Sequence, residues 1–102
     1  MATVYVTEFA GYGTDFKGIN TTVPQQLPLA EQTVAIGGSS VQSAAFNALT
    51  SVVRVHTDAI CSVAFGVSAT ATATKMRMAA GQTEYFAVPQ NGAFKVAVIT
   101  NT

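Results

Sequence analysis

The fold class is decided by the stretch VVRVHTDAICSVAF, which spans residues 52–65. Its first half alternates valines with Arg54 and His56, a period of two that is typical of a strand with one buried and one exposed face. Its second half, residues 59–65, is apolar on both faces except for Ser62. A short apolar run of this kind favours a buried strand. The stretch therefore predicts two β-strands separated by a tight turn.

Outward from this stretch, the same alternation recurs in residues 3–9, 32–36, 83–88 and 94–100. Turn-forming residues separate these candidate strands, at positions 37–40, 66, 81 and 89–92. Because Asn and Gly tolerate the positive φ of tight turns, we expect the last of these to be a hairpin connection. Six to eight short strands predict an all-β fold, a small antiparallel β-sandwich or jelly roll, with a small barrel as the alternative.

Three segments do not fit this strand pattern. Residues 41–49 space their apolar side chains as one or two helical turns would, although Ser, Thr and Asn weaken a helix there. Residues 68–74 alternate Ala with Thr, which predicts either a polar edge strand or a close approach of another backbone. Residues 11–31 form a long connection containing Pro and Gly, of a length that is uncommon in a compact domain. We expect residues 11–31 to be either a flexible loop or an arm that orders against a neighbouring chain.

Charge is scarce in this chain of 102 residues, which is long enough for a single β domain, residues 1–102. Ten residues are charged, five of each sign, and 49% are hydrophobic, whereas a soluble domain usually carries about 25% charged residues. Residues 94–100 are also apolar on both faces near Val98 and Ile99. We therefore expect the chain to associate with copies of itself or with other proteins. A monomer coated with Thr, Ser and Gln is the alternative.

The basic residues are scattered and the formal net charge is zero, which argues against a nucleic-acid partner. No apolar run approaches the ~18 residues of a membrane span, and no stretch resembles a signal peptide. We therefore expect neither a nucleic acid nor a membrane as partner.

His56, Asp58 and Cys61 are the one cluster of reactive residue types in the sequence. A Cys–His pair can provide a nucleophile, but a thiol on a buried strand is inert. One His and one Cys cannot supply the four ligands of a structural zinc site. We therefore expect no catalytic residue, no metal site, no cofactor and no enzymatic activity.

Three long stretches resemble small structural proteins of tailed bacteriophages. They are LAEQTVAIGGSS at residues 29–40, SVVRVHTDAICSVAF at residues 51–65 and MAAGQTEYFAVPQNGAFKVAVI at residues 78–99. The order of TEF near the start, a Pro-containing segment ending in LAEQ, then VRVHTDA and TEYF is similar over most of the chain.

This resemblance implies a capsid cement or decoration protein, which would bind and stabilise the major capsid protein shell. It also implies a homo-oligomer, a dimer or trimer, on the capsid exterior of the virion, made in the host cytoplasm. A head-fibre, head–tail or tail-tip module is the alternative of the same origin. The alternative from another class is a carbohydrate- or ligand-binding β domain that stacks its ligand on Tyr5, Tyr12 and Tyr85.

Overall fold

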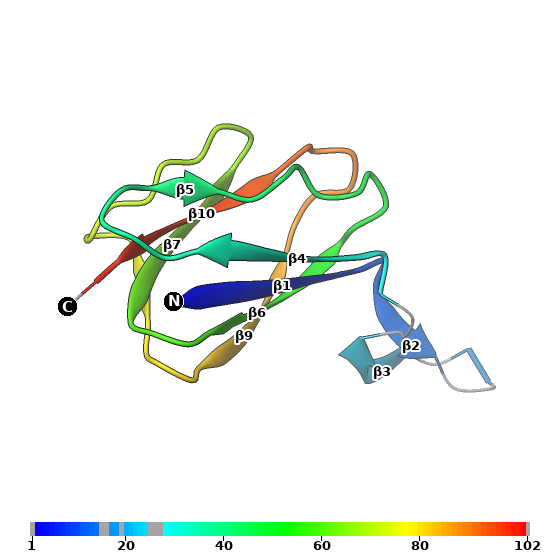
Figure 1. Cartoon of the computed structure of the whole chain (residues 1–102). Helices are drawn as coiled ribbons and strands as arrows, with labels where there is room; N and C mark the ends of the chain where they lie inside the picture. Colours follow the sequence, from blue (N-terminus) through cyan, green and yellow to red (C-terminus); the bar gives the residue numbers. More distant parts are fainter. Residues whose placement is uncertain (1, 15–16, 19, 25–27, 102) are drawn as a thin grey trace.

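Two four-stranded antiparallel sheets pack face to face in the computed structural model, which describes residues 2–14, 17–18, 20–24 and 28–101 (Figure 1). Sheet 1 contains, in spatial order, β4 (Ala30–Ala35), β1 (Thr3–Phe9), β6 (Val52–Thr57) and β9 (Thr83–Ala87). Sheet 2 contains β5 (Val41–Gln42), β10 (Lys95–Thr100), β7 (Cys61–Gly66) and β8 (Met76–Met78). The all-β sandwich predicted from the sequence is therefore confirmed.

Most connections of the sandwich cross from one sheet to the other. Of the seven steps between consecutive sandwich strands, five cross, namely β4 to β5, β5 to β6, β6 to β7, β8 to β9 and β9 to β10. Repeated crossing of this kind is typical of a jelly roll. The hairpin expected at residues 89–92 is wrong, because β9 and β10 lie in different sheets. Asn91 does have a positive φ of 60°, but its turn leads the chain from one sheet to the other.

The core is a layer of valine side chains between the two sheets. Seven valines are at most 2% exposed: Val4, Val6, Val53, Val55, Val63, Val96 and Val98. Their β-branched side chains suit the pleated inner faces of the sheets. Phe65 of sheet 2 packs against Phe86 of sheet 1, with ring centroids 4.8 Å apart, and against Phe46, at 6.4 Å. The alternation of valines in the sequence thus corresponds to the inner faces.

The connection from β5 to β6 contains no helix, so the helical turns considered for residues 41–49 are wrong. Two side chains of sheet 1 instead bind its backbone. Gln32 Oε1 accepts the N–H of Ala44 at 2.9 Å, and Glu8 Oε1 accepts the N–H of Asn47 at 2.7 Å. Because these N–H groups are bound by side chains, the segment stays irregular while Phe46 is buried, at 6% exposure.

A small ribbon extends from the end of the β1–β4 pair. β2 (Tyr12–Thr14) pairs antiparallel with β3 (Asn20–Pro24), and among the described strands each pairs only with the other. The ribbon stands away from the sandwich (Figure 1), and the principal axes of the chain measure 47, 26 and 21 Å. The long loop or arm expected over residues 11–31 contains this ribbon, and its last two residues belong to β4. No helix of the described residues is long and apolar enough to cross a membrane.

Candidate interaction surface

The connection from β7 to β8 covers the outer face of sheet 2. Ala71 in this loop is 2% exposed, and its N–H donates to Ser40 Oγ, which lies just before β5. Further along the loop, the carbonyl oxygen of Ala73 accepts Nδ2 of Asn101, the residue that follows β10, at 3.2 Å. The same Nδ2 also donates to Ser62 Oγ at 2.6 Å. These hydrogen bonds tie the loop to both β5 and the end of β10, so it passes over the sheet.

The polar edge strand considered for residues 68–74 is therefore wrong, and the segment agrees with the other alternative, a close approach of another backbone. Of its residues only the small Ala71 is buried, whereas Thr70, Thr72 and Thr74 are exposed. A small side chain allows the loop backbone to come close to the sheet below.

This cover also explains why β10 is apolar on both faces. Val98 belongs to the core, whereas Ala97 alternates with it and points to the other side, yet both are fully buried. Ser62 of the neighbouring strand β7 also faces outward and is also fully buried. The second apolar face of β10 is therefore covered by the chain itself, and it gives no support to self-association.

The outer face of sheet 1, in contrast, carries exposed side chains on several of its strands. One cross-strand row holds Thr33, Tyr5, His56 and Thr83, and the next row holds Glu31, Thr7, Arg54 and Tyr85. We call these eight residues the open face. Tyr5 and Tyr85 are 44% and 48% exposed. Tyrosine and arginine are the residue types that are enriched at protein interfaces, so this face is the candidate interaction surface.

The charges of the open face are separated from each other. Glu31 and Arg54 lie in one row with Thr7 between them, so their Cα atoms are two strand spacings apart, roughly 10 Å. Neither side chain has an ion-pair partner among the described residues. The face therefore offers one acidic and one basic group that are available to another molecule.

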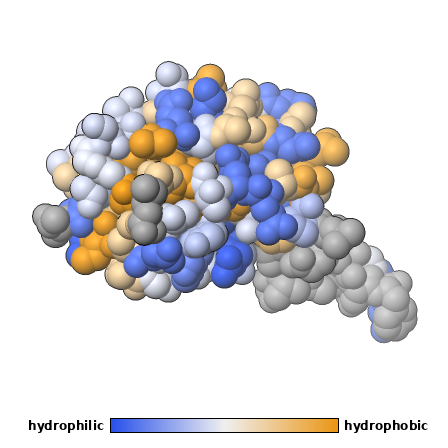
Figure 2. Space-filling view, in the orientation of Figure 1, coloured by the Kyte–Doolittle hydropathy of each residue, from blue (hydrophilic) through white to orange (hydrophobic). Residues whose placement is uncertain are grey.

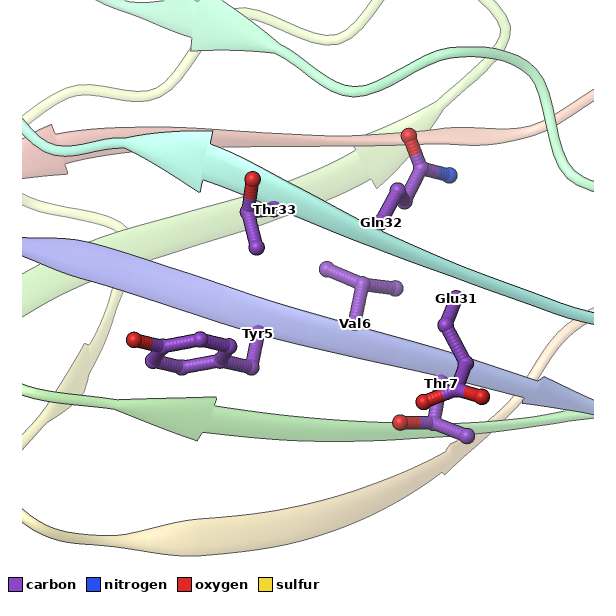
Figure 3. A pocket seen from close by; sticks show the side chains of 6 residues that line it. All are labelled: Tyr5, Val6, Thr7, Glu31, Gln32 and Thr33. Carbon is purple, nitrogen blue, oxygen red and sulfur yellow. The ribbon is translucent and has the colours of Figure 1, made fainter.

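A shallow hollow lies on this face between β1 and β4. Its lining includes Tyr5, Thr7, Glu31 and Thr33. Figure 3 shows the Glu31 side chain directed toward Thr7, whereas Val6 and Gln32 point to the other side of the sheet. The hollow combines an aromatic ring, two hydroxyls and a carboxylate, a set that can hydrogen-bond and stack but that contains no nucleophile–base pair.

The three reactive residues named from the sequence do not form one site. His56 lies on the open face, where its Nδ1 is 2.7 Å from Thr83 Oγ1. Cys61 is fully buried in the core on the opposite side of sheet 1, with Sγ 3.5 Å from Thr57 Oγ1. Asp58 is exposed in the turn after β6. Among the described residues, no group of three His, Cys, Asp or Glu side chains could hold a metal ion.

Two of the three candidate stacking tyrosines share the open face, namely Tyr5 and Tyr85. The side chain of Tyr12 lies outside the described part of the structure. The sequence did not predict that Glu31 and Arg54 lie in the same cross-strand row. The pattern shows which face of each strand a residue occupies, but the register between strands that are distant in sequence was needed to align these two.

Apart from Tyr5 and Tyr85, the exposed large hydrophobic side chains are dispersed. Four are between 40% and 59% exposed, and they come from four different strands or loops: Val41, Leu49, Val67 and Met76. On the side seen in Figure 2, hydrophobic residues lie in small groups between hydrophilic ones. Any interface of the described surface therefore combines polar and aromatic contacts.

Comparisons with protein-family models, with curated proteins and with solved structures found no match to this chain. What the chain does is therefore inferred from its own residues, and the resemblance to phage virion proteins remains an expectation.

Proposed function

We propose that this chain is a non-enzymatic structural protein of a tailed-phage virion, which decorates the capsid exterior and stabilises the shell of the major capsid protein. The observation that carries this proposal is the β2–β3 ribbon. It stands away from the sandwich, and each of its strands pairs only with the other among the described strands. A two-stranded hairpin by itself is marginally stable in water, so a ribbon held away from its own core is best stabilised by another chain.

The ribbon also has the chemistry that a bridging contact needs. The outer edges of β2 and β3 present backbone N–H and C=O groups that no described strand pairs. An edge of this kind can add to a strand of a neighbouring subunit, and main-chain hydrogen bonds then supply the affinity. A chain bound through both its ribbon and its sandwich would hold two capsid subunits together, because the second contact becomes intramolecular once the first has formed.

The scarcity of charge sets the expected salt dependence of this attachment. Ten charged residues among 102 leave few ion pairs for salt to screen. Attachment through backbone pairing and apolar contact should therefore persist when sodium chloride is raised from about 50 to 500 mM, a range over which the Debye length falls from well above 10 Å to a few Å.

The experiment compares virions made with the full chain, without it, and with a chain that lacks residues 14–22. The deletion removes parts of β2 and β3 and the residues between them, and it removes no residue of either sandwich sheet. We expect virions without the protein to assemble but to release DNA at a lower temperature, and purified full-length chain to restore resistance. The shortened chain should fold, as judged by far-UV circular dichroism, but should not restore resistance.

Unchanged heat and osmotic resistance together with loss of attachment to host cells would rule out the cement role and favour a fibre or tail-tip module. Failure of the protein to co-purify with virions would rule out both.

A second candidate function is favoured by the two exposed tyrosines of the open face. Aromatic rings beside the hydroxyls of Thr7 and Thr33 and the carboxylate of Glu31 could bind a carbohydrate by stacking and hydrogen bonds. A glycan array probed with the full chain tests this function. Binding of a defined glycan that is lost in Tyr5→Ala would support it, and an array without a specific signal would exclude it.

A further inference from the structure

We propose that the open face binds the open face of a second copy of this chain, around a twofold axis that runs along β1. The inference starts from which surfaces of the sandwich are free. The outer face of sheet 2 is covered by the β7–β8 loop, so its central residues Ala97 and Ser62 are fully buried. The outer face of sheet 1 carries exposed tyrosines and two charged groups without ion-pair partners. It is therefore the sandwich face that can accept a partner.

The order of the strands makes this face self-complementary. β1 lies between β4 and β6, so a half-turn about an axis along β1 exchanges the positions of β4 and β6. The register places Glu31 of β4 and Arg54 of β6 in one row, on either side of Thr7. The same half-turn therefore sets Glu31 opposite Arg54 of the second copy and sets Arg54 opposite Glu31 of the second copy. An isologous interface requires this reciprocity.

The adjacent row matches in the same way. Thr33 of β4 and His56 of β6 flank Tyr5, so each Thr33 hydroxyl lies opposite His56 of the second copy. The His56 ring binds Thr83 through Nδ1, which leaves Nε2 to meet that hydroxyl. Tyr5 and Thr7 lie on the axis, and each meets its own counterpart. Two sheets stacked in this manner keep their strands within about 30° of each other.

The size of the overlap sets the strength of the dimer. The half-turn superposes β4, β1 and β6, while β9 extends beyond the second copy. Three strands at ~4.8 Å and three rows at ~6.8 Å, namely the two rows of the open face and the adjacent row of Thr3 and Ala35, cover roughly 14 by 20 Å, or about 290 Å² on each copy. The row on the other side adds nothing, because Phe9 and Val52 are 3% and 8% exposed within the chain itself. An interface of this size is smaller than the standard one and belongs to the weak class. We therefore expect a dissociation constant in the micromolar range, which two reciprocal ion pairs make sensitive to salt.

This inference does not depend on the virion role, although the dimer would supply a second ribbon for attachment to a shell. The two can fail separately, because the dimer forms in purified protein and weakens with salt, whereas attachment to the shell should resist salt.

The test is sedimentation equilibrium of the full chain and of charge variants at concentrations up to several hundred micromolar. Glu31→Arg and Arg54→Glu each set like charges opposite one another at two places, so we expect each to raise the dissociation constant at least tenfold. The double variant exchanges the charges and should return to within about threefold of the original chain. Arg77→Glu, an exposed charge change on β8 of sheet 2, is the matched control and should have no effect.

A second measurement does not rely on charge reversal. Thr7→Cys places a thiol on the axis, and a short bismaleimide should link two copies, whereas Ser68→Cys on the β7–β8 loop should not be linked. Native Cys61 is buried and should not react. A monomer at several hundred micromolar would overturn the proposal. The proposal would also be overturned if both single charge reversals left the dimer unchanged. It would fail as well if the single variants folded but did not dimerise and the double variant did not restore the dimer, or if Thr7→Cys and Ser68→Cys were linked equally.

Discussion

Glu8→Ala would remove a buried carboxylate that holds the irregular β5–β6 connection against sheet 1. Glu8 is 2% exposed. Its Oε1 accepts the N–H of Asn47 at 2.7 Å and the hydroxyl of Thr50 at 2.9 Å, and its Oε2 accepts Gln32 Nε2 at 3.2 Å. Three donors from two separate segments thus converge on one side chain, and the Thr50 donor is itself 1% exposed.

The expected loss of stability follows from these bonds. A hydrogen bond to a charged group contributes about 1.5–3 kcal/mol, and a buried donor left without a partner costs about 1–3 kcal/mol. The two bonds to Oε1 therefore set the scale, since water can replace the longer, partly exposed bond to Gln32. Removal of the buried charge also relieves its desolvation, so we expect Glu8→Ala to lower the free energy of unfolding by about 2–4 kcal/mol.

Glu8→Gln refines this prediction. It keeps the acceptor for Asn47 and Thr50 but sets a second NH₂ group against the NH₂ group of Gln32. Gln32 cannot turn its amide to adapt, because its Oε1 and Nε2 both bind the backbone of Ala44. The expected loss is about 1–2 kcal/mol, which is between that of Glu8→Ala and zero.

The assay is urea unfolding followed by far-UV circular dichroism, at one protein concentration for all variants. Asp58→Asn is the matched control, because it changes an exposed carboxylate to an amide, and it should lie within about 0.5 kcal/mol of the original chain. A loss below about 1 kcal/mol for Glu8→Ala would refute the reasoning. An equal loss for both Glu8 variants would show that the bonds to Asn47 and Thr50, which Glu8→Gln keeps, contribute nothing. No loss for Glu8→Gln would show that the Gln32 contact has no role.

Two further changes test other parts of the structure. Ala71→Asp sets a charge beneath the β7–β8 loop and should lower the free energy of unfolding in urea by about 2–3 kcal/mol. Ala73→Asp changes an exposed residue of the same loop and should stay within about 0.5 kcal/mol of the original chain. Equal losses for the two variants would contradict the covering role of the loop. Cys61→Ser should cost only about 1–2 kcal/mol, because Thr57 Oγ1 lies within reach of the new hydroxyl. A thiol reagent should label Cys61 in urea but not in the native protein, and rapid native labelling would contradict its burial.

The strands that alternate strictly could be predicted from the sequence because their side chains record which face is buried. β1 begins and ends at the expected residues, 3–9, and β6, residues 52–57, corresponds to the first half of the stretch 52–65. β5 and β8, with two and three residues, were missed because so short a segment contains too little alternation to detect. The crossing between β9 and β10 was also missed, since the turn residues at 89–92 suit a hairpin and a crossing equally well.

The candidate surface was only partly predictable for a related reason. Scarcity of charge draws attention to buried surface, but it does not distinguish burial by another chain from burial by the chain itself. The β7–β8 loop accounts for part of that surface, because it covers the outward residues Ala97 and Ser62. What remains for a partner is the face on which Glu31 and Arg54 align, and this alignment depends on the pairing of three strands from separate parts of the sequence. Self-association therefore has to be sought on sheet 1, where salt and reciprocal charge reversal can distinguish it from a general attraction between apolar surfaces.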